Sequence, residues 1–74
     1  MKKEKWAVID IGSNTIRLVI YEKMNHASLK EAENIKTTAR LRHYLTNEGT
    51  LNSDGISLLI KILQGFNDIL HFHQ

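Results

Sequence analysis

The chain has 74 residues, no cysteine, and a net charge of +2 from 10 basic and 8 acidic side chains. This length allows one small domain with a thin hydrophobic core, and the absence of cysteine excludes disulfides and thiolate metal sites. The weak positive charge argues against nucleic-acid binding, which needs a larger basic patch. The apolar segments are too short to cross a membrane, which takes about 20 residues, so we expect a cytoplasmic protein.

The first third of the chain predicts a β-hairpin. Residues 6–12 are mostly apolar and rich in β-branched types, and residues 15–23 alternate between apolar and polar side chains over much of their length. Alternation with a period of two is typical of a half-buried strand, and the short Gly/Ser/Asn segment between the two runs indicates a turn. The predicted buried face of the second strand carries Ile16, Leu18 and Ile20.

A third strand is expected at residues 31–39, after a weaker turn signal at Asn25–His26. Propensity alone leaves helix and strand nearly even there, because Lys30 to Glu33 favour a helix whereas the following Ile and Thr residues favour a strand. An antiparallel meander is the simplest continuation of a hairpin, so we predict a strand.

Residues 42–52 are expected to form a loop, with Ser53 as the N-cap of a helix over residues 54–72. The apolar residues of this helix recur at helical spacing and cover about half of its surface, which exceeds what one neighbouring element hides. The fold class is therefore α+β, a three-stranded antiparallel meander followed by a helix. One expectation for the uncovered apolar face of the helix is a homodimer.

Asp10 is the residue that demands an explanation, because a carboxylate inside an apolar strand is costly to bury unless it binds something. It lies just before Gly12, whose small size allows close approach of an anion, and backbone N–H groups at Ser13, Asn14 and Thr15 can converge on a phosphate. An ordinary hairpin turn in which Gly12 takes a positive φ is the alternative interpretation.

The segment from Trp6 to Glu22 has the sequence WAVIDIGSNTIRLVIYE. It resembles the opening of the exopolyphosphatase and guanosine pentaphosphate phosphohydrolase family, which belongs to the actin-like ATPase superfamily. The resemblance implies that residues 1–74 are the opening part of an actin-like, ribonuclease H-like α/β domain.

The resemblance also implies roles for matching positions. Asp10 would hold Mg²⁺ or its water near the scissile phosphate, and Arg40 would contact an anion from the neighbouring loop. An ordinary surface arginine is the alternative interpretation of Arg40. Phosphate would be cradled by Gly12, Ser13, Asn14 and Thr15. The partner would be inorganic polyphosphate or a phosphorylated guanosine nucleotide.

The family's catalytic glutamate is expected beyond residue 74, as is its second, glycine-rich phosphate motif. The resemblance implies that the whole family member is a hydrolase that acts with Mg²⁺. The 74 residues alone are therefore predicted to be inactive. Two alternatives remain open, namely a fragment of an actin-like kinase or ATPase and a small self-associating module without catalysis.

Overall fold

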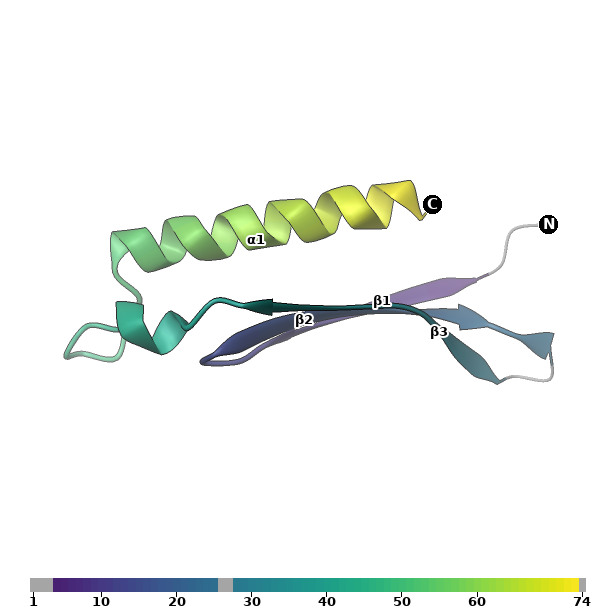
Figure 1. Cartoon of the computed structure of the whole chain (residues 1–74), viewed down its shortest axis with the longest axis horizontal. Coiled ribbons are helices and arrows are strands. Elements are labelled where there is room, and N and C mark those ends of the chain that lie inside the picture. The colour runs from purple at the N-terminus through teal and green to yellow at the C-terminus, as the bar shows by residue number, and fades with distance from the viewer. Residues whose placement is uncertain (1–3, 26–27, 74) are drawn as a thin grey trace.

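The computed structural model describes residues 4–25 and 28–73. Its elements, in chain order, are β1 (Lys5–Ile11), β2 (Thr15–Lys23), β3 (Leu29–Thr38), a 3₁₀ helix η2 (Leu41–Tyr44) and α1 (Ser53–Phe72). The strands form one antiparallel sheet in the order β1-β2-β3, and α1 lies along one face of it (Figure 1). The prediction of an α+β meander followed by a helix is confirmed.

The register of the β1–β2 hairpin assigns each side chain to a face of the sheet. Ile9 lies opposite Leu18, and Asp10 lies opposite Arg17. Since successive side chains of a strand point to opposite faces, Ile9 shares the face of Leu18, whereas Asp10 and Arg17 point to the other. Leu18 is packed beneath α1, so Asp10 leaves the sheet on the side away from the helix.

The third strand starts two residues earlier than predicted and ends one residue earlier, at Leu29 and Thr38. Pairing with β2 overrides the helical propensity of its first half, as tertiary contacts commonly do. The register passes from Ile20↔Glu33 to Tyr21↔Glu31, which makes Ala32 the extra residue of a β-bulge. Within the predicted turn at Asn25–His26, His26 lies outside the described residues.

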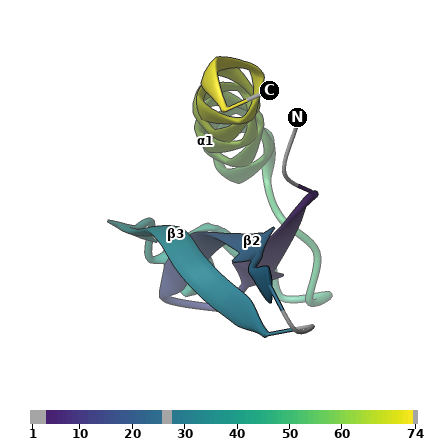
Figure 2. The same ribbon diagram turned by 90° about the vertical axis from the view of Figure 1, so that its right-hand side faces the viewer.

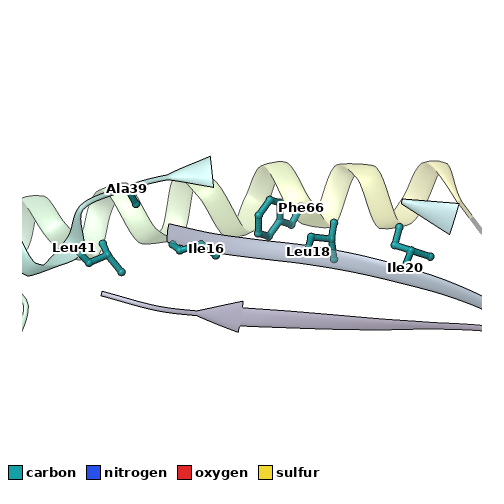
Figure 3. Close-up of a cluster of buried hydrophobic side chains, with 6 residues drawn as sticks. All are labelled: Ile16, Leu18, Ile20, Ala39, Leu41 and Phe66. Carbon is teal, nitrogen blue, oxygen red and sulfur yellow. The ribbon is translucent and has the colours of Figure 1, made fainter. Parts of the chain in front are cut away.

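The core lies between the sheet and α1. Its buried residues, drawn in Figure 3, are Ile16, Leu18, Ile20, Ala39, Leu41 and Phe66. The three β2 residues are those predicted, and Leu18 is fully buried. Seen along the strands, α1 covers only one face of the sheet, and no other element of the described chain covers the opposite face (Figure 2).

The helical apolar arc is only partly covered. Phe66 is 3% exposed, but Ile60 is 50% exposed and Phe72 is 86% exposed. A single three-stranded sheet thus leaves part of the arc open, as its width predicted. None of the helices in residues 4–25 and 28–73 has the length and apolarity that crossing a membrane requires.

The segment before α1 is more ordered than the predicted loop. It contains η2 and an isolated bridge between Leu45 and Leu51. The helix cap is Asn52 and not Ser53, because the Asn52 side chain accepts a hydrogen bond from the Gly55 N–H at 2.9 Å. Gly55 allows the first helical turn to approach η2, since a Cβ there would lie 2.6 Å from the Cβ of Tyr44.

Candidate functional site

The turn between β1 and β2 is a tight two-residue connection. The Gly12 N–H donates to the Thr15 carbonyl at 2.9 Å, which leaves Ser13 and Asn14 at the tip. Gly12 is not among the described residues with positive φ, so the positive φ that the ordinary-turn interpretation assigned to it is wrong. Its lack of a side chain matters for space, because a Cβ at Gly12 would lie 3.0 Å from the Thr15 carbonyl oxygen.

The segment that follows β3 fixes this turn in place. The Asn14 carbonyl accepts hydrogen bonds from the N–H groups of Ala39 and Arg40, each at 2.9 Å. The Ser13 carbonyl accepts a third bond, from the Arg42 N–H at 3.0 Å. These bonds hold the turn in one conformation, so a ligand that binds it would not have to order it first.

The same bonds set the direction of the turn's N–H groups. In a trans peptide a carbonyl and the following N–H point in opposite directions, and the described chain has no cis peptide bond. Because the Ser13 carbonyl is directed at Arg42, the Asn14 N–H points away from that segment. Neither the Ser13 nor the Asn14 N–H has an acceptor among the described residues, so both are available to an external anion.

Arg40, for which the resemblance implies an anion contact, lies beside the turn, and the contact that the structure shows is made by its backbone N–H with the Asn14 carbonyl. It adopts a left-handed conformation, with φ 50° and ψ 49°, which is uncommon outside glycine. Its side chain is exposed and forms no ion pair with any residue that the structure describes. The guanidinium is therefore a free positive charge within one side-chain length of the turn.

Asp10 is exposed on the sheet face opposite α1. Its cross-strand neighbour Arg17 does not pair with it, because the Arg17 guanidinium donates instead to the side-chain oxygen of Asn34 at 2.6 Å. In the described part of the chain no ion pair engages the Asp10 carboxylate. Thr15 follows the same alternation and leaves the sheet on the same face as Asp10.

The chemistry of Asp10 suits one mode of magnesium binding. Among the described residues no group of three or more His, Cys, Asp or Glu side chains could hold a metal, so this part of the chain offers no cage of protein ligands. Mg²⁺ commonly keeps several waters and is held by one or two carboxylates together with substrate phosphate oxygens. The lone carboxylate of Asp10 fits that role, in which metal and phosphate bind together.

Sequence reasoning missed the part that Ala39 and Arg42 play in holding the turn. Their position follows from the topology, because a meander returns the end of β3 to the start of β2. The predicted sheet order therefore contained this signal, although neither residue carries a motif of its own.

A scan against models of protein families finds no match for this chain, and a search of curated proteins finds none either. A functional assignment thus depends on the geometry of the turn and on the resemblance carried by residues 6–22.

Proposed function

We propose that this chain is the first phosphate-binding segment of a cytoplasmic phosphatase that removes the terminal phosphate from inorganic polyphosphate or guanosine pentaphosphate. The observation that carries the proposal is the turn tip, where the N–H groups of Ser13 and Asn14 are free while the carbonyls are bonded to the segment after β3. Backbone N–H groups held in this way form a binding site for anions. The Trp6 to Glu22 resemblance supports phosphate as that anion.

Each residue of the site would act by position and charge. Ser13 and Asn14 would donate backbone hydrogen bonds to phosphate oxygens, and the Ser13 and Thr15 hydroxyls would add donors. Arg40 would neutralise negative charge next to the turn. In phosphoryl transfer the protein contributes mainly positioning and electrostatic stabilisation, which is what these groups supply.

Asp10 would hold Mg²⁺ together with the phosphate chain. When bound, the metal neutralises charge on the phosphate oxygens. The glutamate that activates the attacking water in the resembled family is expected outside these residues. We therefore predict that the 74-residue chain binds phosphate chains and releases no phosphate from them.

Two substitutions at Ser13 test the backbone role directly. Ser13→Pro removes the N–H but keeps the carbonyl that bonds Arg42, and proline suits the first central position of a turn without positive φ. Ser13→Ala keeps the N–H and removes the hydroxyl. Calorimetric titration with tripolyphosphate and Mg²⁺ should show binding by the wild type, weaker binding by Ser13→Ala, and a loss of about tenfold or more for Ser13→Pro.

The proposal is overturned if the wild type and Ser13→Pro bind tripolyphosphate with equal affinity while circular dichroism shows that both proteins are folded. Release of inorganic phosphate from polyphosphate by the purified chain would contradict the separate prediction of inactivity. A colorimetric phosphate assay measures that release.

A further inference from the structure

β1 forms one of the two free edges of the sheet, and β3 forms the other. The strand order leaves β1 with only β2 beside it, and all seven residues of β1 are exposed. None of them belongs to the buried cluster or to the residues packed against it. Val8 is 53% exposed and Ile9 is 38% exposed, so apolar side chains are open on both faces of the strand.

Two hydrogen bonds show which backbone groups of β1 face this edge. The Gly12 N–H donates to Thr15, and the Glu4 carbonyl accepts from the Lys23 N–H. Residues that bond a neighbouring antiparallel strand alternate along the chain, so the even-numbered positions of β1 face β2. The odd-numbered residues Lys5, Ala7, Ile9 and Ile11 direct their N–H and C=O groups outward.

The middle of this edge lacks the features that keep edge strands from pairing. Natural edges are protected by charges, proline, bulges or short length. The chain contains no proline, and the register from Lys5 to Ile11 against β2 is unbroken. The two charged residues of β1, Lys5 and Asp10, lie near its ends, and the four residues between them are uncharged.

We propose that a second copy of this chain pairs with the free edge of β1, antiparallel and centred on Val8, to form a six-stranded sheet. In this register Ala7 of each copy faces Ile9 of the other, and Lys5 faces Ile11. These are the four outward-facing residues, so every free N–H and C=O of the edge is paired. If the register shifts by two residues in either direction, some of these outward-facing N–H and C=O groups have no partner.

Charge and shape agree with this register. Lys5 faces an isoleucine and Asp10 faces Trp6, so no like charges meet.

A two-fold axis perpendicular to the sheet places both helices on the same face. Each helix packs on β2 and β3, and its C-terminal end also reaches β1, where the Lys5 Nζ donates to the His73 carbonyl at 2.6 Å. Where the two helices lie over β2 of their own copies, they are three strand spacings apart, or about 14 Å. Packed helices need only about 8–10 Å, so the copies do not clash.

The first test is the oligomeric state of the full chain, measured by sedimentation equilibrium over a range of concentrations. The wild type should form a dimer, and Ile9→Lys should raise the dimer dissociation constant by about tenfold or more, since a lysine on the edge opposes pairing. Ile60→Lys is the matched control, because Ile60 is similarly exposed but lies on α1. It should leave the dimer intact.

A second measurement needs no variant. Amide hydrogen exchange in the wild type should protect Ala7 and Ile9 increasingly as concentration rises, while the Val8 and Asp10 amides, bonded to β2, are protected at all concentrations. A monomer throughout, or a dimer abolished by Ile60→Lys and not by Ile9→Lys, would overturn the proposal. Tripolyphosphate binding and the oligomeric state are measured separately, so either proposal can fail alone.

Discussion

Val8 and Val19 lie directly opposite each other in the β1–β2 hairpin, yet they differ sharply in exposure. Val8 is 53% exposed and Val19 is 9% exposed. Both occupy the sheet face that α1 does not cover, so the helix is not the cause. The difference comes from the sheet order, because β2 has a strand on each side and β1 has a strand on one side only.

In this chain, an apolar composition does not by itself make a strand buried. β1 is as apolar as a central strand and sits at an edge. A strand that is apolar on both faces is typical of the interior of a sheet. The composition of β1 is therefore that of a strand with a neighbouring strand on each side. The predictions below test how far β1 and β2 differ in what they contribute to stability.

The largest expected effect is the difference in lost stability between alanine substitutions at Leu18 and at its cross-strand neighbour Ile9. Leu18→Ala removes a fully buried side chain and should lower the free energy of unfolding by about 2–5 kcal/mol, through lost transfer energy and a cavity. Ile9→Ala should cost less than about 1 kcal/mol, because its site is open and can rehydrate. Urea denaturation at concentrations where the chain is monomeric measures both. Equal losses would show that β1 is covered as β2 is.

A smaller effect is expected at the start of α1, whose position over β2 gives that strand its buried face. Asn52→Ala removes the side chain that accepts from Gly55 and should cost about 1 kcal/mol. Ser53→Ala, one residue along, should cost only a few tenths. Thermal denaturation followed by circular dichroism compares the two. The opposite order would identify Ser53 as the functional cap.

The smallest expected change in stability is at Arg40, where a substitution should stabilise the fold, whereas the substitutions above destabilise it. Arg40→Gly relieves a left-handed backbone conformation and should stabilise the fold by up to about 1 kcal/mol, offset in part by the entropy of glycine in the unfolded chain. The same substitution should weaken tripolyphosphate binding. Arg40→Lys, which keeps the charge, should retain most of the binding. Unchanged affinity in Arg40→Gly would remove Arg40 from the site.

Much of the fold could be predicted from the sequence. The alternation in β2 located Ile16, Leu18 and Ile20 in the core, and the spacing in α1 located Phe66 against them. The start of β3 and the cap at Asn52 could not be placed as well, because each depends on a local competition that side-chain pattern does not decide. Asn52 and Ser53 are both good caps, and only the backbone around Gly55 selects between them.

The site was predicted less completely. The sequence located the turn, and the family resemblance implied that Arg40 contacts an anion from a neighbouring loop. It could not show that the Ser13 and Asn14 carbonyls bond the segment after β3, which leaves the two N–H groups free. Nor could it show that Arg17 bonds Asn34 and leaves Asp10 without an ion pair. Those outcomes depend on three-dimensional contacts among residues far apart in the chain.

The most direct test of the phosphate site is a nuclear magnetic resonance titration of the full chain with tripolyphosphate and Mg²⁺, followed at each backbone amide. Binding at the turn should give the largest saturable shifts at the Ser13 and Asn14 amides, with smaller shifts at Asp10 and Arg40. The β1 edge amides of Ala7 and Ile9, which are also free in the monomer, should not respond. Shifts that are absent from Ser13 and Asn14, or no larger there than at Ala7 and Ile9, would contradict the account.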